Sequence, residues 1–410
     1  MVNRDLQKRL RRLGALRKEH QARRQQITPA RHTSLEDLPG AAIQHTDFGP
    51  CFQTQETLTT QQKPGPHRLG DWLNLRSDVL ASVVDTPQLE TTDISDYVFL
   101  DTETTGLGGG AFAFQVGIGI FEHNGDFTLK EYFLRDPAEE AAMLHILSEI
   151  LTQGKALVTF NGRSVDVPLL TGRYIMNRLP GVISSLPNLD LLGPARRLWR
   201  RRLPSCALSA LEKDVLSVRR TTQDVPGWAI PQMYQRYLQT GDSREMVDVL
   251  YHNRIDILSM VTLAVEIHNA FAEPRNRPFD DLLSLGRLYE KQAMVNEAES
   301  VYRDAANAAH TDEDVHEALN LLAGLLKRHD RREEAAPVWE KAAALCVDCA
   351  AHEELAKYHE WHTRDLRQAL HWTDKAVALA SGWRRGVRQK LTLNTLEHRR
   401  SRLLNKIARQ

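Results

Sequence analysis

The segment 97–110, YVFLDTETTGLGGG, most constrains the fold, because an apolar run ends there in two acids and glycines follow. Segments 111–123 and 127–134 come next and are rich in aromatic and β-branched residues, which favours strands. Three consecutive strands with short connections predict an antiparallel meander. Asp101 and Glu103 are two residues apart on the first strand, so both carboxylates point to one face near its end.

Alternating elements follow the meander. Two more apolar strand patterns, at 155–162 and 188–192, alternate with helical patterns. Strands first and then alternating strands and helices predict an α/β protein with a mixed sheet flanked by helices. Beyond Ser205 the signals are all helical, and 243–271 is predicted as one long amphipathic helix.

The C-terminal third contains two similar units, 37 residues apart, in which small and aromatic residues recur at the spacing of a tetratricopeptide repeat. Small residues at these positions let paired helices cross closely. The two units contain Leu285, Gly286, Tyr289, Ala298, Tyr302 and Ala305, and then Leu322, Ala323, Leu326, Ala335, Trp339 and Ala342. The pattern predicts an all-α helical-repeat domain, with generic helical hairpins as the alternative.

Pattern and composition together divide the chain into three parts. Residues 1–94 are predicted as a basic N-terminal helix and a loop-rich extension, because Thr, Gln, Pro and His dominate beyond residue 26 with weak periodicity. Residues 95–275 hold the α/β domain. Residues 282–410 hold the helical repeats, which end in a basic helix.

The charges are unevenly placed along the chain. The 53 Lys and Arg balance the 53 Asp and Glu, and a net charge of zero alone argues against a nucleic-acid partner. Residues 1–40, however, carry ten basic and four acidic side chains, and residues 382–410 carry nine and one. Basic ends around an acidic body indicate nucleic-acid or membrane contact, or else solvated helices with exposed Lys and Arg.

The compartment is predicted from what the sequence lacks. The N-terminus has positive charge without the apolar core of a secretory signal, and no apolar run approaches the length that spans a bilayer. Four cysteines are far fewer than a disulfide scaffold needs and fit a reducing cytosol. We therefore expect a cytoplasmic protein without membrane contact.

Two further segments carry acids that fit with the two strand acids. Asp166 stands in NGRSVDVPLL, after a strand that ends at Asn161, where it could also cap the next helix. His252 and Asp256, in HNRID, are four residues apart and share a helix face, as an ordinary surface pair would. Clustered carboxylates repel one another unless a cation neutralises them, and Mg²⁺ or Mn²⁺ prefers such oxygen ligands.

The order DTETTGL, NGxSxDxPLL and HNxxD resembles the DEDD exonuclease superfamily with its RNase H-like fold. More narrowly, it resembles the bacterial YprB-like branch, which joins such a domain to tetratricopeptide-like repeats. The resemblance covers residues 95–275 strongly and 282–380 in outline. It implies an exonuclease with two divalent metal ions, Mg²⁺ or Mn²⁺, that hydrolyses DNA from the 3′ end.

The resemblance also implies a cellular setting. It implies work in DNA repair, with DNA as the partner in preference to RNA and with a helicase or other repair protein docked on the repeats. Two alternatives stay open: a nucleic-acid-binding scaffold with an inactive RNase H-like domain, and an exoribonuclease.

The resemblance implies a role for each site residue. Asp101 would bridge both metal ions, Glu103 and Asp256 would hold the ion that activates water, and Asp166 would reach the second ion through water. His252 would be the general base. It lies four residues before Asp256, whereas the usual His-type branch has its His five residues before, so Tyr251 at that place is an alternative.

Residues near the acids are candidates for substrate contact. The glycines after the first strand could let a terminal nucleotide approach the backbone, or form a flexible turn. Five arginines within 196–202 could contact phosphates, or form a solvated helix face. For Asp190, Trp199 and Trp228 we favour structural roles. The predicted substrate-binding residues are Thr104, Gly106, Leu107, Asn161, Arg196, Arg197, Arg200 and Arg201.

Overall fold

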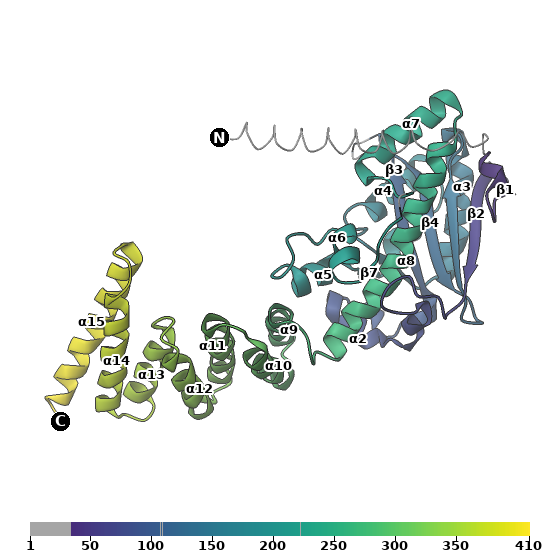
Figure 1. Ribbon diagram of the computed structural model, residues 1–410. Helices are drawn as coiled ribbons and strands as arrows, with labels where there is room; N and C mark the ends of the chain where they lie inside the picture. The colour runs from purple at the N-terminus through teal and green to yellow at the C-terminus, as the bar shows by residue number, and fades with distance from the viewer. Residues whose placement is uncertain (1–33, 107, 109, 222) are drawn as a thin grey trace.

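The N-terminal part of the computed structural model is a mixed sheet flanked by helices (Figure 1). The structure describes residues 34–410 except 107, 109 and 222, so the helix predicted for 1–26 lies outside the described residues. Within the described chain seven strands form one sheet in the order β1-β2-β5-β4-β3-β6-β7. The strands are β1 (Ala42–Thr46), β2 (Gly49–Leu58), β3 (Tyr97–Thr104), β4 (Ala113–Phe121), β5 (Phe127–Phe133), β6 (Ala156–Thr159) and β7 (Asn188–Asp190).

The predicted meander is confirmed, because β3, β4 and β5 pair antiparallel in sequence order. β6 pairs parallel with β3, and β7 pairs parallel with β6, so the sheet is mixed as expected. β3, β6 and β7 therefore end at the same edge of the sheet. Side chains that follow these three strand ends meet there, as in other sheets with parallel strands.

Two strands lie in the region that was predicted to be a loop-rich extension. β2 pairs with β5, and β1 pairs with β2. The sequences of these strands, AIQHT and GPCFQTQETL, lack a clear alternation of apolar and polar residues, because a polar residue such as Thr54 is buried. The predicted boundary between residues 94 and 95 therefore cuts through the sheet and is wrong.

Helices cover both faces of the sheet. α8 crosses one face and packs on β3, β4 and β5 (Figure 1). On the other face, Leu100, Val116 and Ile118 belong to a buried cluster with apolar residues of α3. The helices of this part are α2 (Ser77–Val84), α3 (Glu140–Gln153), α4 (Asp166–Met176), α5 (Leu192–Trp199), α6 (Leu208–Asp214), α7 (Ile230–Thr240) and α8 (Arg244–Ala272).

Glycines in β4 let α8 approach the sheet closely. A Cβ atom on Gly117 would lie 1.9 Å from Oδ1 of Asn253, and one on Gly119 would lie 2.9 Å from Cγ2 of Ile257. The backbone of β4 thus leaves room that side chains would otherwise fill. As a result the middle of α8 lies against the end of β3.

α8 is long and apolar enough to cross a membrane, judged by length and composition alone. This corrects the expectation that no apolar run approaches that length. The protein itself, however, buries 72% of the most apolar window of α8. Packing on the sheet therefore accounts for its apolar character, as in other core helices.

The C-terminal part is an array of helices that extends away from the sheet (Figure 1). Each helix packs on the next in sequence. A Cβ atom on Gly286 would lie 2.3 Å from the ring of Tyr302, so a small residue at this predicted repeat position lets α9 and α10 cross closely. The helices are α9 (Phe279–Lys291), α10 (Val295–Ala308), α11 (Asp312–Arg328), α12 (Arg332–Ala344), α13 (Ala350–Trp361), α14 (Leu366–Ser381) and α15 (Val387–Ile407).

One buried apolar cluster joins the two parts. It runs from Trp72 through α8 and α9 to Leu355 in α13. The array and the α/β part therefore share a core, instead of being connected only by the chain between α8 and α9.

Candidate active site

The four acids predicted from the sequence come together at the edge where the parallel strands end. Asp101 and Glu103 lie in β3, Asp166 begins α4 after β6, and Asp256 is in α8. The negative charges of the other three all raise the pKa of Asp101, in addition to the larger effect of burial. The four carboxyls therefore form one electrostatic cluster.

Burial raises the pKa of each of these carboxyls. The pKa of Glu103 rises to about 8, and that of Asp166 to about 6. For Asp256, burial outweighs the lowering by His252 and Arg220. Carboxyls that resist ionisation in this way are stabilised as carboxylates when a cation lies among them.

Two polar residues that the sequence analysis did not single out hold the acids in place. Nδ2 of Asn253 donates a hydrogen bond of 2.8 Å to Oδ2 of Asp101. The hydroxyl of Thr102 donates to Asp166. Both residues stand inside the motifs DTETTGL and HNRID, so their position beside an acid was the available signal.

His252 faces the acids from one turn before Asp256. Its Nε2 lies 3.8 Å from Oε1 of Glu103 and 3.6 Å from Oδ2 of Asp256. Its Nδ1 lies 2.8 Å from Oδ1 of Asp224 and 3.1 Å from a guanidinium nitrogen of Arg220. The Nδ1–H tautomer uses the shorter contact by donating to Asp224, and it leaves Nε2 open toward the acids. Burial lowers the pKa of His252, but Asp224 and the nearby acids together raise it above its ordinary value.

Tyr251, the alternative to His252, has a different partner. Its hydroxyl accepts a hydrogen bond of 3.2 Å from the backbone N–H of Thr221. The geometry therefore favours His252 over Tyr251 as the residue that serves the acids.

Arg220 enters the site from residues 215–221, which, like 223–226, are irregular instead of helical as predicted. Two of its nitrogens donate to Glu212 at 2.6 Å each, and it also donates to Asp256 and Asp224. Burial would lower the pKa of Arg220, yet these carboxylates raise it. Because an irregular segment has no periodicity, no sequence signal placed Arg220 and Asp224 at the site.

The donor chemistry fits divalent cations. Four carboxyls with raised pKa values, of which Asp166 is buried and the other three are partly buried, provide the oxygen ligands that Mg²⁺ and Mn²⁺ prefer. Among the described side chains, no group of three or more His, Cys, Asp and Glu is already arranged as metal ligands. Arg220 pairs with Asp256, so a bound cation would compete with that ion pair.

The predicted contacts near the strand ends lie beside the acids. The hydroxyl of Thr104 donates to the carbonyl of Gly106 at 3.2 Å, which closes the end of β3. Asn161 follows β6 with a φ of 67°, and its backbone N–H donates to Asp190 at 2.9 Å. Asp190 accepts from two more backbone N–H groups, so the preferred structural role is confirmed. Leu107 lies outside the described residues.

The arginine segment packs against the helical array. Arg201 pairs with Asp280 and Glu317, and Arg202 pairs with the buried Asp281. Arg197 donates to the backbone carbonyl of Val83. The structure thus gives Arg197 and Arg201 protein partners, which differs from the prediction that these two contact the substrate.

Arg196 on α5 and Arg200, directly after the end of α5, are exposed one turn apart. A pocket of about 420 Å³ lies between α5 and α9, where a concentration of cations attracts an anion such as a phosphate backbone. Its cationic lining is Arg196, Arg197, Arg200, Arg201, Arg287 and Lys291. Substrate contact by Arg196 and Arg200 stays a prediction, now placed at this junction.

The two tryptophans differ. Trp199 is buried in the core, as predicted, whereas Trp228 is 53% exposed in the short helix Gly227–Ala229. A Cβ atom on the neighbouring Gly227 would lie 3.9 Å from Nε2 of His252. Trp228 therefore lies beside the site with surface on which a base could stack.

Comparison with known proteins agrees with this geometry. Residues 98–268 match the family model of the RNase_H superfamily. The chain is also similar to "Uncharacterized protein YprB" of Bacillus subtilis (strain 168), with 31% identity over 294 residues. The match covers 69% of this chain and 69% of that protein.

Proposed function

The chain belongs to the YprB-like group of the RNase H superfamily, and on that premise we propose that it is a metal-dependent exonuclease that shortens DNA from the 3′ end. Membership of this superfamily indicates a nuclease. The observation that carries the proposal is the convergence of four buried or partly buried carboxyls at one sheet edge with His252 facing them.

The residues of the site would have different roles in the reaction. Asp101, Glu103, Asp166 and Asp256 would hold two divalent cations, Mg²⁺ or Mn²⁺, which supply an activated water and stabilise the leaving oxygen when bound. His252 would serve as the general base, with Nε2 as the atom that accepts the proton. Asp224 keeps the Nδ1 hydrogen bond and stabilises the charged ring that results.

The surroundings of the acids support action on a strand end. Among the described residues, none lies within 4 Å of a Cβ atom placed on Gly106, so the backbone at this position leaves room for a terminal nucleotide. Trp228 offers stacking surface beside His252, and Arg196 and Arg200 offer positive charge farther along. DNA as substrate, a role in DNA repair and a helicase or repair protein on the array complete the proposal and rest on the family resemblance. A cytoplasmic location is proposed from the cysteine content and the N-terminal sequence.

The test is degradation of end-labelled strands. We expect wild type with Mg²⁺ or Mn²⁺ to release mononucleotides from 3′-labelled DNA at once and to shorten 5′-labelled DNA stepwise. Asp101→Ala should abolish both. Glu122→Ala is the matched control, because Glu122 is an exposed acid beyond the far end of β4 and its loss should change nothing.

A second candidate is a nucleic-acid-binding scaffold. The ion pair of Arg220 with Asp256 favours it, because that pair neutralises one acid without a metal ion. Tight DNA binding without cleavage under Mg²⁺ or Mn²⁺ would establish the scaffold and reject the exonuclease. The same assay with labelled RNA, single- and double-stranded, decides between DNA and RNA.

A further inference from the structure

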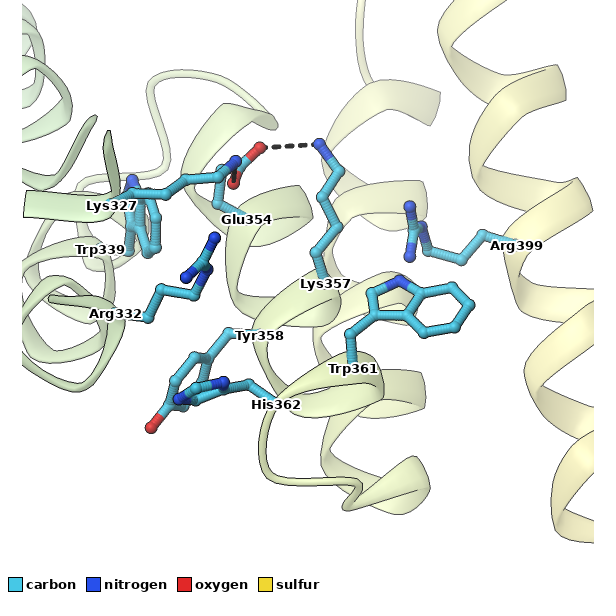
Figure 2. A pocket seen from close by; sticks show the side chains of 9 residues that line it. All are labelled: Lys327, Arg332, Trp339, Glu354, Lys357, Tyr358, Trp361, His362 and Arg399. Atoms are coloured by element: carbon cyan, nitrogen blue, oxygen red, sulfur yellow. Dashed lines mark hydrogen bonds and ion pairs between the residues drawn. The ribbon is translucent and has the colours of Figure 1, made fainter. Parts of the chain in front are cut away.

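The helical array contains a second pocket, of about 460 Å³, that lies apart from the acids (Figure 2). Its side chains come from α11, α12, α13 and α15 and are mostly basic or aromatic. Lys327, Arg332, Lys357 and Arg399 supply positive charge, and Tyr358 and Trp361 supply rings.

Buried acids hold the basic side chains in place at this pocket. Glu360, whose side chain is fully buried, accepts from Arg399 and Arg402 at 2.7 Å each and from Lys406 at 2.9 Å. Glu354 in turn accepts from Lys327 at 2.5 Å and from Lys357 at 2.7 Å, as Figure 2 shows. Two carboxylates thus pair with five cations, which leaves an excess of positive charge around the pocket. Arg332 pairs with the exposed Asp330 at the edge of the pocket.

Exposed rings lie among these cations. Trp361 is 61% exposed, and the amino group of Lys406 lies 4.4 Å from the centre of its ring. Tyr358 and His362 are neighbours, with ring centres 5.4 Å apart. Aromatic faces interleaved with cations are the two components of sites that bind single-stranded nucleic acid without sequence preference.

We propose that this pocket binds single-stranded DNA, with phosphates on Lys357, Arg332 and Arg399 and a base on Trp361. The hydrogen-bonding character of the lining favours nucleic acid over a peptide. The basic side chains are donors, and the carboxylate of Glu354 in the lining already accepts from two lysines. A peptide needs acceptors for its N–H groups, for which the lining offers the Tyr358 hydroxyl and the His362 ring, whereas a phosphate backbone carries acceptors alone and uses the more numerous donors.

The pocket would hold a distant part of the strand whose end is cut. In this respect the inference rests on the proposed function. The sheet and the helices α13 and α15, which line part of the pocket, lie toward opposite ends of the molecule, with α9 and α10 between them (Figure 1). The basic pocket between α5 and α9 lies at the junction, so positive charge recurs along the way.

The test is equilibrium binding of fluorescent single-stranded DNA to the full chain, with chelator present so that cleavage plays no part. We expect Trp361→Ala combined with Lys357→Glu to weaken binding of a long oligonucleotide about tenfold or more. The slope of log affinity against log salt should become shallower by about 0.7 for each phosphate that the variant no longer neutralises. A short oligonucleotide that reaches only the carboxylate site should bind both proteins equally.

The controls separate this surface from general charge and folding. Lys341→Glu reverses an exposed charge on α12 outside the pocket. The affinity of this variant for the long oligonucleotide should be at least tenfold higher than that of the double variant. Trp361→Phe keeps a ring and should keep most of the affinity. An unchanged melting temperature shows that the double variant is folded.

Two results would overturn the inference. One is equal affinity and equal salt slope for wild type and the double variant. The other is loss of binding to a protein partner while DNA affinity stays intact, which would assign the pocket to protein docking. Absence of nuclease activity would reject the exonuclease alone, because binding is measured without cleavage.

Discussion

At the scale of single residues, the pairing of His252 with Asp224 decides how the site handles protons. One ring nitrogen is held by Asp224 at 2.8 Å, and the other faces Glu103 and Asp256. A carboxylate in this position fixes the tautomer and the orientation of the ring. Asp224 is therefore a positioning residue, which acts through His252.

We predict that Asp224→Asn lowers kcat about 100-fold and leaves KM for DNA within about twofold, because the ring loses its orientation but the acids remain. Loss of the hydrogen bond also lowers the pKa of His252, so the acid limb of the kcat profile should move to lower pH. Steady-state kinetics between acidic and alkaline pH measure both effects. A fall in affinity with unchanged kcat would contradict this role.

A second residue, Glu131 on β5, governs stability instead of chemistry. Gln115 donates to one of its oxygens at 2.9 Å, Thr54 contacts the other at 3.1 Å, and burial raises its pKa to about 8. Between its ordinary value near 4.5 and about 8, the folded state keeps a proton that the unfolded state has lost. Folding stability therefore falls as pH rises through this window.

We predict that Glu131→Gln, which keeps the shape and both hydrogen-bond partners, raises the free energy of unfolding by about 2–4 kcal/mol at pH 8. At pH 5 the gain should be under about 1 kcal/mol, because the acid is protonated in the folded state and partly so in the unfolded state. Urea unfolding at the two pH values measures the difference. An equal gain at both values would show that packing, not ionisation, is responsible.

At the scale of elements, the contact of β4 with α8 sets the geometry of the site. Gly117 lies between Asp101 on β3 and Glu131 on β5 in the strand register, and Asn253 sits directly on it. The helix that carries His252 and Asp256 is therefore positioned by a missing side chain on a neighbouring strand.

We predict that Gly117→Ala costs about 1–3 kcal/mol of stability, because its Cβ would meet Asn253 at 1.9 Å and push α8 away. A shift of the helix would also lower kcat by more than about tenfold. Gly172→Ala in α4 is the control, since its Cβ meets nothing within 4 Å and should stabilise the helix by up to about 1 kcal/mol. Nuclease assays and urea unfolding on both variants give the comparison.

The sequence predicted elements where one face is uniformly apolar. The meander and the long helix ending near Ala272 carry such patterns, and the structure confirms them. β1 and β2 could not be predicted because β1 is mostly exposed and β2 carries polar residues at buried as well as exposed positions, so neither strand shows a clear apolar face. The acids could be predicted because each stands in a short sequence motif. Arg220 could not, because it reaches them from a segment whose path depends on tertiary packing.

At the scale of the whole molecule, ion pairs fasten the array to the α/β part. Arg202 pairs with Asp281, whose side chain is only 4% exposed, and Arg201 pairs with Asp280 and Glu317. The sequence showed five clustered arginines but not their partners, which lie 79 or more residues away. Arginine side chains that the sequence suggested for substrate contact thus partly bind the α/β part to the helical array.

We predict that Arg202→Ala destabilises the junction by about 1–3 kcal/mol, because it leaves Asp281 buried without its partner. Limited proteolysis should then cut faster near residues 274–278. Adding Asp281→Asn should restore much of the loss, since no unpaired charge remains. Arg275→Ala, at an exposed position nearby, should behave as wild type; equal proteolysis of all variants would show that the pair does not fasten the junction.

The continuous core has a consequence for the length of the DNA fragment that remains after digestion. α8, about 43 Å long by its 29 residues, carries His252 and Asp256 and leads into the array without a break in the buried cluster. A strand held at the far pocket and trimmed at the sheet would shrink until it no longer spans the two. Digestion would then stall at a residual fragment of fixed size. The length of that fragment would correspond to the distance between the far pocket and the carboxylate site.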